Sequence, residues 1–120
     1  MASRKRQQAE RRGRWAEHYA ALWLQLSGYS IQARRVRFSF GEIDLIARRG
    51  NTLAFVEVKQ RRTLEAAQTA VSLKSWQRIA HAAESWAHRN ERYHLLDWRY
   101  DLVAITPWAR PKHYKDFWRP

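Results

Sequence analysis

The sequence predicts an α/β domain whose central mixed β-sheet is flanked by helices. Two aliphatic runs, at residues 43–47 and 53–58, lie on either side of a short turn candidate that contains Gly, which predicts a β-hairpin. Helical periodicity at residues 14–26 and 72–89 predicts two amphipathic helices. A further strand is predicted at 99–105, after the second helix. This strand–helix–strand order indicates a right-handed crossover and parallel pairing with the second run of the hairpin.

The chain is predicted to hold one domain between two basic flanking segments, because its length suits a single modest core. Residues 1–13 form a basic arm, residues 14–106 the domain and residues 107–120 an aromatic and basic tail. The arm is expected to be mobile at first, and it either holds phosphates or only improves solubility. Prolines discourage regular structure in the tail. The tail either packs back over the domain, which we favour, or presents its aromatic side chains to unpaired bases.

The first helix is predicted to bury a stripe of large side chains and to end near Gly28. The stripe, including the smaller residues that widen it, consists of Trp15, Ala16, Tyr19, Ala20, Leu22, Trp23 and Leu26. Residues 29–40 should form a first strand and a basic connection. Residues 60–71 lack a clear period and are expected to form a loop near the substrate.

The second helix should start after the N-cap candidate Ser72. Its predicted apolar face consists of Trp76, Ile79, Ala80, Ala83, Trp86 and Ala87. Residues 90–96 read as a polar exit, after which Leu102 and Ala104 alternate with Val103 and Ile105 along the last strand.

The formal charge of +12, from 23 Lys and Arg against 11 Asp and Glu, is the strongest compositional feature. Such a surface attracts polyanions through counterion release. Nucleic acid is favoured over an anionic membrane because 13% of the residues are aromatic, including seven Trp, and bases can stack on rings. Most of these Trp are nevertheless expected in the core.

Several classes of protein and site are disfavoured by composition. The chain has no Cys, which excludes disulfides, thiolate nucleophiles and Cys-based zinc sites. No apolar run approaches the roughly 20 residues of a membrane span, and no signal-type apolar segment follows the charged N-terminus. We therefore expect a soluble, cytoplasmic protein without a membrane partner.

The hairpin carries charges where a core would be expected. Ile43, Leu45 and Ala47 should share one face, and the opposite face should bring together acidic and basic side chains. A turn of two or four residues would pair Ala47 with Thr52 and place Asp44 diagonal to Glu57. The side chains that then converge are Glu42, Asp44, Glu57 and Lys59.

Three carboxylates in one place repel each other, so positive charge must lie among them. Lys59 supplies one charge, and a hard divalent cation could supply the rest. The competing interpretation is a solvated sheet surface, on which such charges are common. The apolar surroundings of Glu57, and three acids clustered in a chain that has 11, favour a site.

The spacing of these residues brings a resemblance into view. Asp44, followed after a short hairpin by Glu57-Val58-Lys59, resembles the Asp…Glu-x-Lys signature of the PD-(D/E)XK nuclease superfamily. This superfamily has a restriction-endonuclease-like fold. The resemblance implies that Asp44 and Glu57 bind Mg²⁺ or Mn²⁺, with the Val58 carbonyl as a further ligand, and that Lys59 orients water or stabilises charge.

A longer resemblance extends from about Gly13 to about Ile105. Residues 41–47, Gly-Glu-Ile-Asp-Leu-Ile-Ala, and residues 55–59, Phe-Val-Glu-Val-Lys, are similar to the YraN-like family of small bacterial proteins, related to archaeal Holliday-junction resolvases. The other matching segments are Gly13 to Glu17, Gly28-Tyr29, Arg61 and Arg99-Tyr100-Asp101. By spacing alone Glu17 is an ordinary boundary residue of its helix; the resemblance implies that it is a further catalytic acid. Glu42 is a secondary candidate.

Five basic residues are candidates for contacts with nucleic acid. Arg34, Arg35 and Arg37 are expected near the acidic site, where they could clamp phosphates or only form surface pairs with Glu42. Arg35 departs from the family, which usually has Asn at this position. Arg61 and, by the resemblance, Lys74 complete the set.

The function expected from the sequence is that of a metal-dependent DNA endonuclease that selects branched or junction DNA by shape. The expected cofactor is Mg²⁺ or Mn²⁺, and the expected partner is DNA that is branched or contains single strands. A second copy of the chain is a further candidate partner, because junction cutting usually needs two active sites. One alternative is a DNA- or RNA-binding module without hydrolysis; the other is a basic adaptor for a membrane or a protein complex.

Overall fold

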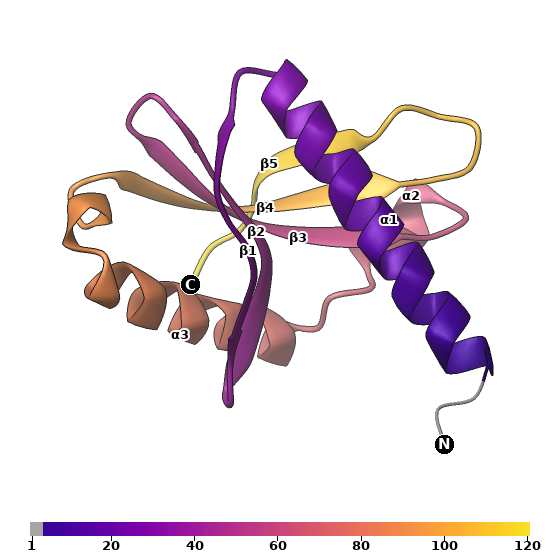
Figure 1. Cartoon of the computed structure of the whole chain (residues 1–120), viewed down its shortest axis with the longest axis horizontal. Helices are drawn as coiled ribbons and strands as arrows, with labels where there is room; N and C mark the ends of the chain where they lie inside the picture. Colours follow the sequence, from indigo (N-terminus) through magenta and orange to yellow (C-terminus); the bar gives the residue numbers. More distant parts are fainter. Residues whose placement is uncertain (1–3) are drawn as a thin grey trace.

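Five strands form one mixed sheet in the order β1-β2-β3-β4-β5 (Figure 1). The computed structural model describes residues 4–120, with side chains from residue 13 onward. The strands are β1 (Ser30–Phe38), β2 (Gly41–Arg49), β3 (Thr52–Gln60), β4 (Asp97–Ile105) and β5 (Lys112–Trp118). Neighbours pair antiparallel except β3 and β4, which pair parallel. The predicted α/β fold, with its mixed sheet and crossover, is confirmed.

Two long helices cover opposite faces of the sheet. They are α1 (Arg4–Leu26), which crosses the sheet diagonally, and α3 (Leu73–Arg89), which follows the short helix α2 (Leu64–Gln68) (Figure 1). A 3₁₀ turn at Glu91–Tyr93 leads into β4. Alternate residues of β3 belong to two separate cores, Phe55 on the α3 side and Val56 on the α1 side. No helix in the described part of the chain is long and apolar enough to cross a membrane.

The first helix starts earlier than predicted. It begins at Arg4 rather than at residue 14, so most of the segment predicted as an arm is helical. The first three residues of that arm lie outside the described part of the chain. The end of the helix is as predicted, because Gly28 adopts a φ of +92° directly after the last turn.

The buried face of α1 differs from the predicted stripe. Trp15, Leu22 and Leu26 are 55%, 53% and 75% exposed. The side chains that face the sheet are mostly small; Ala16 and Ala20 were predicted as part of the stripe, whereas Ala21 and Leu24 were not. Small side chains allow the helix to approach the strands closely, so packing selects this face over the more hydrophobic one.

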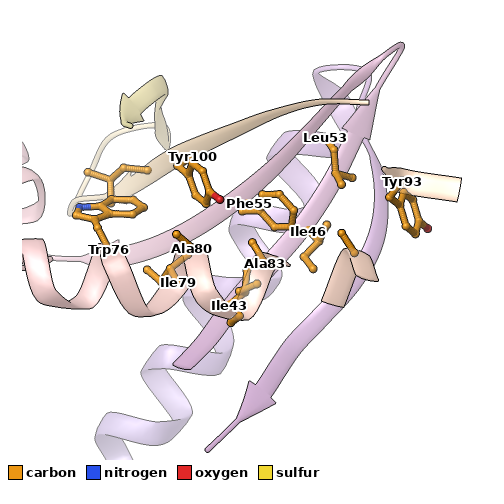
Figure 2. Packing of buried hydrophobic residues seen from close by; sticks show 13 residues of the cluster. Ile43, Ile46, Leu53, Phe55, Trp76, Ile79, Ala80, Ala83, Tyr93 and Tyr100 are labelled. Carbon is orange, nitrogen blue, oxygen red and sulfur yellow. The ribbon is translucent and has the colours of Figure 1, made fainter. Parts of the chain in front are cut away.

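The predicted face of α3 is confirmed. Figure 2 shows Trp76, Ile79, Ala80 and Ala83 of this helix pointing toward the strands, where Phe55 is among the residues that they meet. At the start of the helix Ser72 is the N-cap, and its hydroxyl accepts a hydrogen bond from the Ser75 N–H. This cap satisfies one N–H that the first turn would otherwise leave without a partner.

The hairpin of β2 and β3 forms as predicted, but its register is shifted by two residues. Arg49 pairs with Thr52 around the two-residue turn at Gly50 and Asn51, and Gly50 has a φ of +59°. Ala47 consequently pairs with Ala54 rather than with Thr52. A shift of two keeps every side chain on its face, so the predicted alternation survives the wrong register.

Ile43 is the exception to this alternation. Leu45 and Ala47 pack on the α1 side as one set, whereas Ile43 packs with Ile46 on the α3 side. The paired register of β2 and β3 extends only as far as Leu45 and Val56. Beyond that pair β2 is no longer tied to β3, and the strand can turn its side chains differently.

The tail packs back onto the domain by adding a strand to the sheet. The prediction of irregular structure is wrong for residues 112–118, which form β5 beside β4. Pro107 and Pro111 precede the strand and do not interrupt its ladder. The ring of Trp118 stacks on that of Trp76 with centroids 5.7 Å apart, which ties the added strand to α3.

Candidate metal and nucleic-acid site

The acidic centre lies where β2 and β3 separate. One oxygen of Asp44, Oδ2, accepts a hydrogen bond of 2.8 Å from the Val58 N–H. The Val58 N–H of β3 therefore donates to the Asp44 side chain of β2 rather than to a backbone carbonyl of that strand. This bond fixes the Asp44 carboxylate against β3 and close to Glu57.

Glu57 carries the largest electrostatic anomaly of the site. Its side chain is only 12% exposed, and Lys59 Nζ lies 3.5 Å from its Oε1. Burial raises the pKa of Glu57 from 4.5 to about 9, and the charge and hydrogen bonding of Asp44 act in the same direction, opposed by Lys59. Three of the predicted site residues, Asp44, Glu57 and Lys59, are thus brought together.

Glu17 lies nearby but has a partner of its own. Its Oε2 accepts a hydrogen bond of 2.6 Å from Arg35 Nε, and its side chain is 19% exposed. Arg35 has a φ of +50°, an uncommon conformation for a residue with a side chain. Among the described residues no three His, Asp or Glu side chains are grouped closely enough to hold a metal ion. Glu17, the remaining acid predicted to be catalytic, is instead paired with Arg35 in this structure.

A hollow connects Glu17 to the other acids. It lies between the middle of α1, the start of β2 and the end of β3, and its lining includes Gly13, Glu17, Asp44, Glu57, Lys59 and Arg61. A second hollow opens on the α3 side and shares Glu42, Glu57 and Lys59 with the first. The acidic centre therefore separates two adjoining depressions, one beside each helix.

The secondary candidate, Glu42, lines both hollows without joining the buried pair. Its side chain is 65% exposed and lies 3.9 Å from Arg37 Nε. Of the two interpretations of Arg37, a surface pair with Glu42 is therefore present. Such an exposed pair contributes little to stability.

The remaining basic candidates are spread around the site. Arg61 lines the hollow on the α1 side, and its guanidinium donates to the Gln60 carbonyl at 2.8 Å. Arg34 is exposed on β1 and lies 3.5 Å from the His18 ring. Lys74 is exposed at the start of α3, outside the residues that line either hollow. Only Arg61 of these three lines a depression next to the acids.

Sequence reasoning missed the polar and basic residues that α3 contributes to the second hollow. Ser75, Arg78 and His81 line it from α3. Their spacing of three residues puts them on one face of the helix, and this period was the signal that could have found them. The Arg78 backbone also lies so close to Gly41 that a Cβ there would come within 2.3 Å of the Arg78 carbonyl oxygen. Gly41 thus allows the edge of β2 to approach α3.

Comparison with known proteins places the chain in a family. The model of the uncharacterised protein family UPF0102 matches residues 16–105. The chain belongs to this family. A UPF0102 protein of Mesorhizobium japonicum is 50% identical over 114 residues, covering 95% of this chain and 91% of the relative. A UPF0102 protein of Bartonella tribocorum is 48% identical over 117 residues, covering 98% and 90%. The resemblance to the YraN family drawn from the two motifs is confirmed.

The chemistry of the donor set fits a hard divalent cation. Asp44 and Glu57 offer carboxylate oxygens within reach of each other, and burial together with Asp44 raises the pKa of Glu57 more than Lys59 lowers it. Mg²⁺ commonly binds through one or two carboxylates and keeps several waters, so a site without a third acid suits it. A bound cation would replace the proton that the pair otherwise retains.

Proposed function

We propose that the protein is a metal-dependent endonuclease that hydrolyses phosphodiester bonds in DNA. The observation that carries the proposal is the pair of carboxylates, Asp44 and Glu57, held together beside Lys59 in a hollow of a strongly basic protein. Two neighbouring carboxylates that share a single ammonium cost folding free energy when buried, so their position favours a bound cation. Branched or partly single-stranded DNA is the proposed substrate, selected by shape.

Asp44 and Glu57 would hold the ion, with the Val58 carbonyl as the proposed third protein ligand. When bound, Mg²⁺ or Mn²⁺ would polarise a phosphate and lower the pKa of a bound water. The hydrogen bond from the Val58 N–H keeps Asp44 oriented before any ligand arrives. This preorganisation removes rotamer freedom that binding would otherwise have to remove.

Lys59 has a separate role. Its ammonium lies beside Glu57 and its side chain is 28% exposed, so it can reach both the carboxylate and the solvent of the hollow. There it would stabilise the charge that develops on a phosphate during attack, or orient the attacking water. Arg61 and Arg62, which line the same hollow, would hold the flanking phosphates.

The proposal is tested by cleavage of labelled DNA at low salt. The substrates are a duplex, a single strand, a 5′ flap, a splayed arm and a four-way junction, each with Mg²⁺, Mn²⁺ or EDTA. We expect metal-dependent cutting that falls to background in Asp44→Ala. Asp97→Ala, which removes an exposed acid at the start of β4, is the matched control and should cut normally. Cutting that persists in Asp44→Ala would refute the assignment.

A second candidate function is a nucleic-acid-binding module without hydrolysis. The observation that favours it is the ion pair of Glu17 with Arg35, which withholds a third acid from the centre. Binding of the same panel without cutting in either metal, and unaffected by Asp44→Ala, would support this candidate over the endonuclease.

A further inference from the structure

Trp108 stands out in the loop between β4 and β5. Its side chain is fully exposed, and its backbone has a φ of +64°. A bulky residue rarely adopts this left-handed conformation, because its Cβ crowds the neighbouring carbonyl. The residue therefore costs backbone free energy and buries no ring surface in the fold. Such strain without a folding benefit points to a role outside folding.

A second exposed tryptophan, Trp15, lines a hollow together with Trp108. Trp15 of α1 is 55% exposed, and its ring packs on Tyr19 with centroids 5.2 Å apart. Trp15, Tyr19 and Trp108 all line a depression between α1 and the β4–β5 loop. Three aromatic side chains from two segments, α1 and the β4–β5 loop, thus line one open depression.

This aromatic hollow adjoins the acidic one. Gln60 and Pro107 line both depressions, so the two are continuous along the end of β3. Arg110 lines the aromatic hollow, and Arg61 and Arg62 line the acidic one. An apolar surface with cations on both sides suits a ligand that joins flat rings to negative charges. Single-stranded nucleic acid has this composition.

We propose that Trp15 and Trp108 stack on an unpaired nucleobase whose strand continues to the acidic centre. The proposal rests on the proposed function only in placing a phosphate at Asp44 and Glu57. A base within a perfect duplex is not free to enter a hollow of this kind, because pairing and stacking hold it in the helix. The aromatic hollow would therefore select substrates with unpaired bases next to the cut, such as flaps and splayed arms.

The test measures binding in EDTA, where hydrolysis cannot interfere. A labelled single strand and a duplex of the same length are titrated with the wild type, Trp108→Ala and Trp108→Phe, and affinity is read from fluorescence anisotropy. Loss of the ring should weaken single-strand binding by roughly 5- to 100-fold and leave duplex binding nearly unchanged. Trp108→Phe should retain most of the affinity. Leu95→Ala, which removes a 97% exposed apolar residue before β4, is the matched control.

An abasic site moved along the single strand locates the stacked base. At one position it should weaken binding to the wild type as much as Trp108→Ala does, with no further loss when the two changes are combined. Equal losses for single strand and duplex would overturn the proposal, and so would an unchanged affinity for both. A change in oligomeric state by sedimentation, without a change in affinity, would assign the aromatic hollow to a second copy of the chain and also overturn it.

The outcomes separate this inference from the proposed function. Single-strand binding that depends on Trp108, in a protein that cuts nothing, would support the inference and refute the endonuclease. Metal-dependent cutting by Trp108→Ala with the substrate preference of the wild type would support the endonuclease and refute the stacking role of Trp108.

Discussion

Two buried carboxylates of this fold have opposite surroundings. Asp101 on β4 is fully buried, and Arg99 donates to both of its oxygens at 2.8 Å. His113 Nε2 lies 2.7 Å from one oxygen, and the Asp116 N–H donates to the other at 2.9 Å. Glu57, in contrast, has one ammonium at 3.5 Å and a second carboxyl group beside it.

The difference appears in the two pKa values. Burial acts to raise the pKa of Asp101, but hydrogen bonds from His113, Arg99 and the Asp116 N–H lower it below its ordinary 3.8. Burial also raises the pKa of Glu57, and Asp44 adds to the increase. A carboxylate whose partners are all supplied by the chain stabilises a fold. One whose partners are incomplete marks a place for a ligand.

Removal of Asp101 should have the largest effect on stability. Asp101→Ala leaves Arg99 and His113 without their common partner and removes the acceptor of the Asp116 N–H of β5. We expect a loss of about 3–5 kcal/mol of unfolding free energy, which is typical when one member of a buried ion pair is removed. Urea denaturation measures it. Asp97→Ala, an exposed acid on the same strand, should change stability little.

A small effect of Asp101→Ala, similar to that of the control, would mean that the two buried acids are not different in kind. The comparison on which the metal assignment depends would then fail.

The pH dependence of stability should have opposite signs for the two acids. Without metal, the folded state retains the Glu57 proton between pH 4.5 and about 9, whereas the unfolded chain has released it. Stability should therefore fall as pH rises through this range, by up to about 1.4 kcal/mol per pH unit. Asp101 stabilises the fold above pH 3.8, and its contribution is lost as the pH falls below that value.

Thermal unfolding in EDTA across this range measures both slopes. Glu57→Gln should remove the loss at high pH, and added Mg²⁺ should reduce it in the wild type. A wild-type slope that survives Glu57→Gln would assign the titration to another group.

The smallest effect is expected from the arginine that holds Glu17. Arg35→Ala converts Glu17 from a partnered acid into an unpaired one that faces the same hollow as Asp44. We expect Mn²⁺ affinity to rise by roughly two- to five-fold, the range that corresponds to one partly exposed ion pair. Calorimetric titration with Mn²⁺ measures the change. Arg37→Ala, which frees only the exposed Glu42, is the matched control. Weaker binding in Arg35→Ala would show that the ion pair supports the metal site.

The sequence predicted best where periodicity and burial agree. The apolar face of α3 was correct because its helical period is clear, and the parallel position of β4 was correct because the strand–helix–strand order implies a crossover. On α1 the prediction that the large side chains are buried was wrong, because hydrophobicity alone ranks Trp15 and Leu22 above alanine. The helix packs by its alanine face, since close approach to the sheet needs small side chains.

The site was predicted through residue types rather than through pairing. Asp44 and Glu57 come together although the expected register was wrong by two residues. They lie just beyond the last paired residues, Leu45 and Val56, where the Val58 N–H holds the Asp44 carboxylate against β3. No local signal shows that Glu17 is held by Arg35, which is distant in sequence and adopts an unusual φ. Long-range ion pairs of this kind follow from tertiary geometry.

Both edges of the sheet are irregular and basic, which has a consequence for self-association. The register shifts near the start of β1 and within the pairing of β5, and these edge strands carry Arg34 and Arg37 on one side and Lys112 and Lys115 on the other. Bulges and like charges oppose the edge-to-edge addition of another copy that leads to fibrils. Repulsion between copies is cancelled where a polyanion lies between them. If DNA is the substrate, as proposed, copies that repel each other in free solution would be able to line up along one DNA strand.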